Sequence, residues 1–163
     1  MPVDHNISSV EAVQNSALCA VLLWSFGRGY QEEVIGSLPF LHLSFLVLPI
    51  VLYRPTLDVL TTTNKVSGLG KFVEKFARQR EDLMAIHTRA LSMRKLTLEA
   101  VSTGIASGLL SVIYEEGLLR ANEVSLRRPP EKLKTYVNGA DKLGRWIARV
   151  PPANVFSLLQ VRP

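Results

Sequence analysis

Apolar residues recur at helical intervals through the first part of the chain. From Val10 to Tyr30 they stand three and four residues apart, which predicts a helix over this range. Between residues 17 and 26 they cover most of the helix circumference. Such a helix is expected to be buried on several sides, within the fold or under a partner.

The most hydrophobic stretch is Leu38–Tyr53, which raises the question of a membrane span. A span needs about twenty apolar residues. This run is shorter, contains His42, and is interrupted by Pro39 and Pro49. The pattern therefore favours a buried helix that begins at Pro39 and is kinked or broken near Pro49.

Apolar residues also stand at helical intervals through the middle of the chain. A short helix is expected over residues 55–60, followed by a polar break at 61–64. Three further helices are predicted over 69–76, 83–91 and 96–107, and Gly108 is suited to end the last one in a left-handed conformation.

A change of pattern follows at Leu109–Tyr114, which is rich in β-branched and aromatic residues. With the turn at 115–117 and the return over Leu118–Val124, it predicts a β-hairpin. Three helices followed by such a wing form the element order of a winged helix-turn-helix, here spanning residues 67–126. The rival local interpretation is one continuous helix over 100–114.

In the C-terminal part the pattern predicts a helix over Asn138–Arg149 that two prolines end. The apolar residues at 154–161 are expected to dock on the core or on a neighbouring protein. The fold class is mainly α: a helical N-terminal block plus a winged-helix-like module with a small hairpin wing. We expect a single domain of 163 residues with an apolar block at 1–64, the module at 67–126 and a basic helical extension at 127–163.

Composition adds two expectations. The chain is 47% hydrophobic, and its first block is more apolar than a lone domain of this size needs, which predicts contact with partner proteins. Residues 1–64 hold two basic and five acidic side chains, whereas the remainder holds seventeen basic and nine acidic ones. The candidate protein-interface residues are Trp24, Tyr30, Phe40, Phe45, Trp146 and Phe156.

The basic residues of the second part are candidates for contact with nucleic acid or with an ATPase. In a winged helix they could contact phosphates on either side of a groove. Ordinary solvated faces, mixed with glutamates, are the alternative. The candidates are Lys71, Lys75, Arg78, Arg94, Lys95, Arg127, Arg128, Lys132 and Lys134.

Catalytic chemistry is not indicated. The segment 68–72 lacks the spacing of a phosphate-binding loop, and the adjacent acidic pairs predict solvated carboxylates. Cys19 lies in an apolar helix, and three scattered histidines without a second thiol do not form a standard zinc site. We expect no catalytic residue, no metal and no cofactor. The first residues do not resemble a signal peptide, so we expect a cytoplasmic protein.

Several short motifs, spread from end to end, resemble the middle components of bacterial three-component ABC systems, which correspond to the small accessory subunit of Lamassu-type anti-phage defence. The family pattern often has proline where Ser16 stands and glycine where Gln160 stands. The matching motifs are Asn15-Ser16-Ala17, Leu22-Leu23-Trp24, Gly29-Tyr30, the block 46–52 with Arg54-Pro55-Thr56, Gly108-Leu109-Leu110, Leu143-Gly144-Arg145-Trp146 and Val161-Arg162-Pro163.

The resemblance implies a non-enzymatic subunit that bridges an SMC-like or ABC-type ATPase and an effector, commonly a nuclease. It would hold the effector inactive and help to release it when foreign DNA is sensed. The expected partners are these two subunits, and DNA through the complex, but no membrane. The residues alone leave two alternatives: a free-standing winged-helix transcriptional regulator, and a peripheral membrane protein that uses Leu38–Tyr53.

Overall fold

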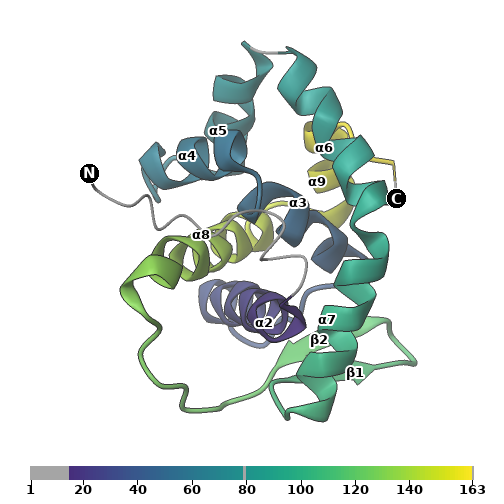
Figure 1. The fold of residues 1–163 in the computed structure, drawn as a ribbon. Coiled ribbons are helices and arrows are strands. Elements are labelled where there is room, and N and C mark those ends of the chain that lie inside the picture. Colours follow the sequence, from purple (N-terminus) through teal and green to yellow (C-terminus); the bar gives the residue numbers. More distant parts are fainter. Residues whose placement is uncertain (1–14, 79, 163) are drawn as a thin grey trace.

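The computed structural model describes residues 15–78 and 80–162. Within these ranges the chain is mainly helical and carries a two-stranded antiparallel hairpin, which confirms the predicted fold class (Figure 1). In chain order the elements are α2 (Ser16–Glu33), the 3-10 helix η1 (Leu41–Leu46), α3 (Val47–Val51), α4 (Arg54–Thr62), α5 (Gly68–Ala77), α6 (Arg80–Ser92), α7 (Arg94–Ala106), β1 (Leu110–Ile113), β2 (Leu118–Ala121), α8 (Glu131–Ala148) and α9 (Pro152–Leu159).

Helix α2 lies at the centre of the molecule, between α8, α7 and the hairpin (Figure 1). It begins after Asn15, whose side-chain Oδ1 accepts a hydrogen bond of 3.0 Å from the Leu18 N–H. Leu22, Leu23 and Phe26 are fully buried. The expected burial on several sides is therefore confirmed, while residues 10–14 of the predicted helix lie outside the described residues.

The apolar run 38–53 folds into η1 and α3 and packs inside this chain, where Leu43, Leu46 and Ile50 are fully buried. Helical structure begins at Leu41 rather than at Pro39, because Pro39 and Phe40 are held by the hairpin: the Leu119 N–H donates to the Pro39 carbonyl at 2.9 Å. Pro49 is the third residue of α3, where a backbone N–H has no helical acceptor. The 3-10 geometry changes to α geometry just before Pro49, between η1 and α3, and the helical segment is interrupted only after Val51, before α4.

Helix α4 follows with Pro55 in its first turn and ends at Thr62, close to the predicted limits. Among the described residues, no single helix has the length and apolar content needed to cross a membrane. Leu41–Val51 and Arg54–Thr62 meet that requirement only when taken together, and they are bent by 98°.

The β-hairpin is present as predicted. Helix α7 ends at Ala106, and Gly108 takes the left-handed φ of 78° that turns the chain into β1. Strands β1 and β2 pair from Leu110 with Ala121 to Ile113 with Leu118, and Gly117 in the turn has a φ of 66°. A continuous helix over 100–114 is therefore wrong.

The predicted winged-helix module has the expected element order, α5, α6, α7, β1 and β2. Its helices also pack on other parts of the chain: α5 lies against α6 of the module but also against α4 and α8, whereas α7 lies chiefly against α2. Helices α6 and α7 follow one another along one edge of the molecule (Figure 1). At their junction the Met93 N–H donates to the Arg89 carbonyl and the Thr97 N–H to the Met93 carbonyl, each at 2.9 Å, while Met93 itself has a ψ of 5° and separates the two helices. The winged-helix assignment itself stays a prediction.

The C-terminal part forms two helices. Helix α8 starts at Glu131, seven residues before the predicted start, and Pro130 stands at its N-cap. Helix α9 begins at the second of the two prolines, Pro152, and its residues Val155, Phe156 and Leu159 are buried against the core. The prediction that the apolar tail docks is confirmed.

One hydrophobic core joins the three predicted parts of the chain. It contains Leu22 from the first part, Phe72 from the second and Trp146 from the third, and the rings of Phe72 and Trp146 lie 5.8 Å apart. The apolar content that predicted partner contacts is thus covered in large measure by the chain itself. The division at 1–64, 67–126 and 127–163 stays a prediction.

Candidate contact surfaces and the polar interface of α2 and α8

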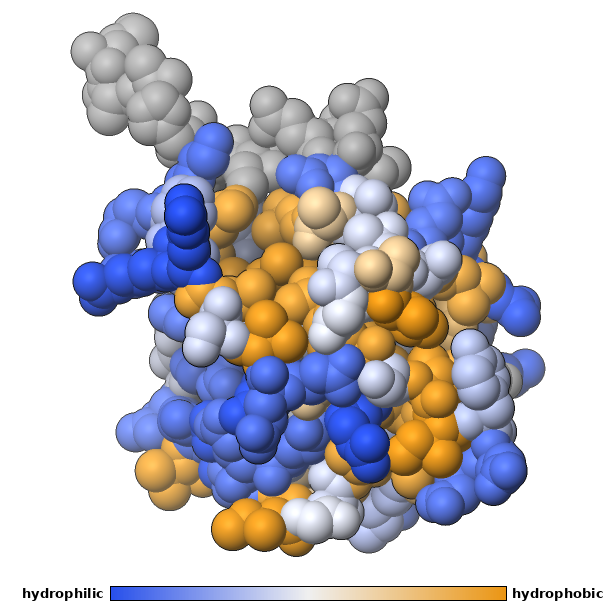
Figure 2. Space-filling view, turned by 90° about the horizontal axis from the view of Figure 1, so that it is seen from below, coloured by the Kyte–Doolittle hydropathy of each residue, from blue (hydrophilic) through white to orange (hydrophobic). Residues whose placement is uncertain are grey.

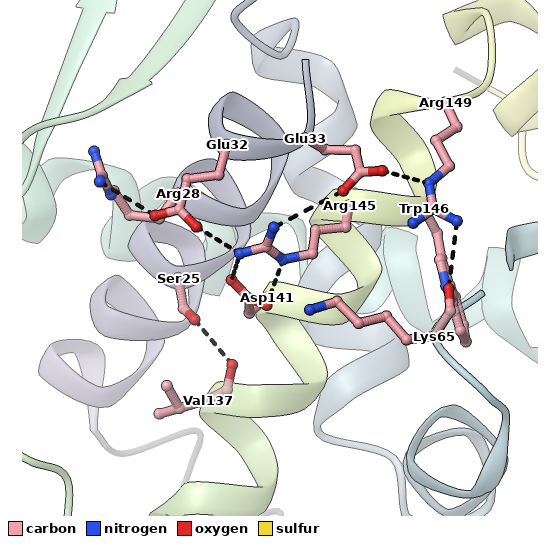
Figure 3. A network of polar contacts seen from close by, with 10 residues as sticks. All are labelled: Ser25, Arg28, Glu32, Glu33, Lys65, Val137, Asp141, Arg145, Trp146 and Arg149. Carbon is pink, nitrogen blue, oxygen red and sulfur yellow. Dashed lines mark hydrogen bonds and ion pairs between the residues drawn. The ribbon is translucent and has the colours of Figure 1, made fainter. Parts of the chain in front are cut away.

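Helices α2 and α8 form the closest helix pair of the fold and run in the same direction. The Ser25 hydroxyl donates to the Val137 carbonyl at 2.9 Å, Gly29 lies against the backbone of Asp141, and the Arg149 guanidinium donates to Glu33 at 2.7 Å. These contacts advance toward the C-terminus on both helices (Figure 3). Two segments more than a hundred residues apart are thereby fixed to each other.

Glycine makes this close approach possible. A Cβ at Gly29 would collide with the Asp141 carbonyl oxygen, and a Cβ at Gly144 would collide with the Phe26 carbonyl oxygen. Both obstacles are backbone atoms, which cannot rotate away as a side chain can. The two glycines of the family-like motifs 29–30 and 143–146 therefore have a packing role.

Arg145 is the centre of a network of charges across the same helix pair (Figure 3). Its side chain, 18% exposed, donates to Asp141 at 2.9 Å and to Glu32 at 2.5 Å, and lies 3.8 Å from Glu33. The hydrogen bond to Asp141, followed by that to Glu32, raises the pKa of Arg145. The hydrogen bond from Arg149 lowers the pKa of Glu33. The lowered pKa favours the ionised form of Glu33, and the cluster as a whole forms structural ion pairs.

Lys142 and Trp146 bind the end of α4 to α8. The Lys142 ammonium donates to the carbonyls of Leu60 and Thr63, each at 3.0 Å, at the C-terminus of α4, where a positive charge is favourable. The Trp146 indole N–H donates to the Lys65 carbonyl at 2.9 Å. Burial, followed by the charges of Lys65 and Lys75, lowers the pKa of Lys142.

The six candidate interface aromatics occupy different environments. Trp146, Tyr30 and Phe156 are buried within the chain, so in this conformation they offer little surface to a partner. Trp24 is half-buried, and its indole N–H donates to the Asn122 carbonyl at 2.9 Å. Phe45 is half-buried, and Phe40 is 39% exposed. Phe40 and Phe45 therefore retain surface that a partner could reach.

The candidate basic residues are not brought into one patch. Lys71, Lys75 and Arg78 lie on and directly after α5, Arg94 and Lys95 begin α7, and Arg127 and Arg128 lie on the segment before α8, far apart in the ribbon (Figure 1). Lys132 and Lys134 stand in the first turns of α8. Three of these cations have an acidic neighbour: Lys71 with Glu74 at 3.2 Å, Lys95 with Glu99 at 3.9 Å and Lys134 with Glu131 at 3.1 Å.

An apolar groove of about 370 Å³, which the sequence analysis missed, lies between α6, η1 and α9. His42 lies across it, stacked on Phe156 with ring centroids 5.0 Å apart, and burial lowers the pKa of His42. No periodicity in one segment could reveal the groove, because its walls come from three. The lining residues are His42, Phe45, Leu46, His87, Ala90, Leu91, Arg94, Phe156, Val161 and Arg162.

Large apolar side chains also remain on the surface. Figure 2 shows a face on which hydrophobic side chains form a band between hydrophilic areas. Among the exposed residues are Met84, Leu91, Leu98 and Ile105, which stand seven residues apart along α6 and α7. The chain thus keeps apolar surface although its most hydrophobic run is buried.

Within the described residues, the groups capable of chemistry are separated or used in structure. Cys19 is fully buried, and burial raises the pKa of its thiol to about 11, which keeps it protonated. No three His, Cys, Asp or Glu side chains of the described part come together as metal ligands.

The fold and its surfaces describe a small helical protein with a single core and a partly apolar, partly basic exterior. A family model described as the ABC-three component (ABC-3C) system Middle Component 3 matches residues 5–163, and the chain belongs to this family. It is therefore a component of a multi-component ABC system, which implies protein partners. No curated protein and no solved structure matches the chain.

Proposed function

We propose that this chain is a non-enzymatic, cytoplasmic accessory subunit that bridges an SMC-like or ABC-type ATPase and an effector nuclease, and couples DNA sensing to release of the effector in an anti-phage system of the Lamassu type. The observation that carries the proposal is the family match over residues 5–163, which makes the chain one component of a three-component system.

The surface supports a bridging role. A subunit that contacts two partners needs two accessible areas, and the described chain has an apolar groove at α6 and α9 and a separate basic segment at 127–134. The most conspicuous charge cluster, around Arg145, is used to fasten α2 to α8 and is not free for catalysis.

Reconstitution tests the coupling. The ATPase and the effector encoded beside this chain are purified and mixed with ATP and DNA, with and without the chain, and nuclease activity is followed. The proposal expects that the effector is silent in the complex without DNA and becomes active when DNA is added. Effector activity that is the same with and without this chain would refute the coupling role.

Direct DNA contact through the segment before α8 is a second candidate. Arg127 and Arg128 are exposed, and neither has a carboxylate partner among the described residues. Free cations on an exposed segment can bind phosphates, and each such contact adds to the salt dependence of affinity. A free-standing regulator would also need exposed cations that bind phosphates. Such a protein would in addition bind a palindromic site as a dimer.

Charge reversal at Arg127 and Arg128 tests whether this segment binds DNA. Arg127→Glu with Arg128→Glu should lower DNA affinity and reduce the slope of log affinity against log salt by about two. Arg54→Glu, at an exposed site on α4, is the control. An unchanged slope would assign the two arginines to solvent. A palindromic sequence recovered by the chain alone would favour the regulator.

A further inference from the structure

Helices α6 and α7 expose an apolar stripe with a regular spacing. Met84, Leu91, Leu98 and Ile105 are 64%, 60%, 49% and 41% exposed, and each stands seven residues after the one before. Seven residues make two helical turns, or about 10 Å along the axis. Only Met93 separates α6 from α7, so the stripe runs along two consecutive helices.

The apolar groove opens beside this stripe, and Leu91 belongs to both. Phe45 and Phe156 supply apolar surface within the groove, while Arg94 and Arg162 supply positive charge. The lining residues that the structure describes include no carboxylate. In the described part of the chain neither arginine has an ion-pair partner, so both charges are available to a ligand.

We infer that the stripe and groove together bind an amphipathic helix of another component of the same three-component system, with apolar anchors about two turns apart and carboxylates beside them. The inference rests on the proposed function, since the partner is a fellow component. A helix with a seven-residue repeat would place one anchor against each residue of the stripe. Its carboxylates would pair with Arg94 and Arg162 at the point where an anchor enters the groove.

The charges and apolar residues of this surface favour an acidic amphipathic helix over a second copy of the chain and over a nucleic acid. A second copy of the chain, docked by a two-fold axis on this face, would bring Arg94 and Arg162 toward the same cations of its mate, which is unfavourable. A nucleic acid would satisfy the arginines but would leave Met84, Leu91 and Leu98 in water. An acidic amphipathic helix satisfies both features.

Site-specific crosslinking locates the partner. A photoreactive benzophenone amino acid replaces Leu91 in the full chain, which is co-expressed with the other components. The control position is Ile35, which is apolar, 93% exposed and placed in the turn after α2. We expect a crosslink from position 91, and none from 35, to a partner segment with an apolar heptad and adjacent acidic residues. A crosslink from 91 to DNA or to a second copy would overturn the inference.

Affinity measurements test the two chemical features separately. Leu91→Glu and Arg94→Glu should each weaken binding to the partner by about tenfold or more. Ile35→Glu and Arg120→Glu, which make the same changes at exposed sites elsewhere, should leave binding within about twofold of wild type. Thermal melting confirms that all four variants fold.

The failures are distinguishable. If the wild-type chain binds no other component, the proposed function is refuted and the inference with it. If the wild-type complex forms and both Leu91→Glu and Arg94→Glu bind as well as their controls, the inference is refuted and the proposed function stands.

Discussion

At the residue scale, Gly29 and Gly144 determine how closely α2 and α8 approach. The sequence showed both as ordinary glycines in helical segments, where glycine is unfavourable. Their role appears only in the structure, because it depends on the carbonyls of Asp141 and Phe26 on the opposite helix. A pattern along one helix contains no information about the backbone that faces it.

Gly144→Ala tests this contact. The added methyl group has no space against the Phe26 carbonyl, so the helices must separate, and the free energy of unfolding should fall by about 3 kcal/mol. Gly70→Ala is the control, because this glycine lies in α5 with open space around it; there stability should rise by about 0.5–1 kcal/mol. Urea denaturation measures both. Equal effects of the two substitutions would contradict the close approach.

Gln160 is a second residue whose backbone conformation matters. It ends α9 with a φ of 53°, a left-handed conformation in which glycine is favoured. We expect Gln160→Gly to raise the free energy of unfolding by about 0.5 kcal/mol, since relief of strain exceeds the added entropy of the unfolded chain. A lower stability of Gln160→Gly than of Gln160→Ala would show that the strain is absent.

At the element scale, helix and strand positions followed from the sequence where the pattern was local. Gly108 stands at the turn into the hairpin and Gly117 in the turn between its two strands, and both adopt positive φ. The start of α8 was missed by seven residues although Leu133, Tyr136 and Val137 stand at helical intervals, and contacts such as that of Val137 with Ser25 hold this part of the helix in place. The groove was missed because three elements build it.

The charge network around Arg145 should be the main polar contribution to the pairing of α2 with α8. Arg145→Met removes bonds to Glu32 and Asp141 and leaves clustered carboxylates, so we expect a loss of about 2 kcal/mol. Lys95→Met, which breaks an exposed pair within one helix, should cost less than about 0.5 kcal/mol. Chemical denaturation at low and high salt reports both values, and a loss from Arg145→Met no larger than that of the control would refute the network's role.

At the scale of the whole molecule, the high apolar content of the sequence predicted partner proteins. The structure weakens that argument, because much of the apolar content is buried inside the chain. The apolar block 1–64 was expected to need cover from partners, and in its described part the chain's own helices provide much of that cover. Partner contact is instead expected at surfaces that no composition count identifies, such as Leu91 beside Arg94. Membership in the middle-component family, rather than excess hydrophobicity, is now the stronger reason to expect a complex.

The central claim is that this chain works bound to the other components of its system. Native mass spectrometry of the three co-expressed components, purified through a tag on this chain, tests it most directly. The account predicts a dominant species that contains the chain together with at least one other component and that persists on dilution. A sole species at the 18.1 kDa of the isolated chain plus its tag, with the other components expressed and soluble, would contradict it.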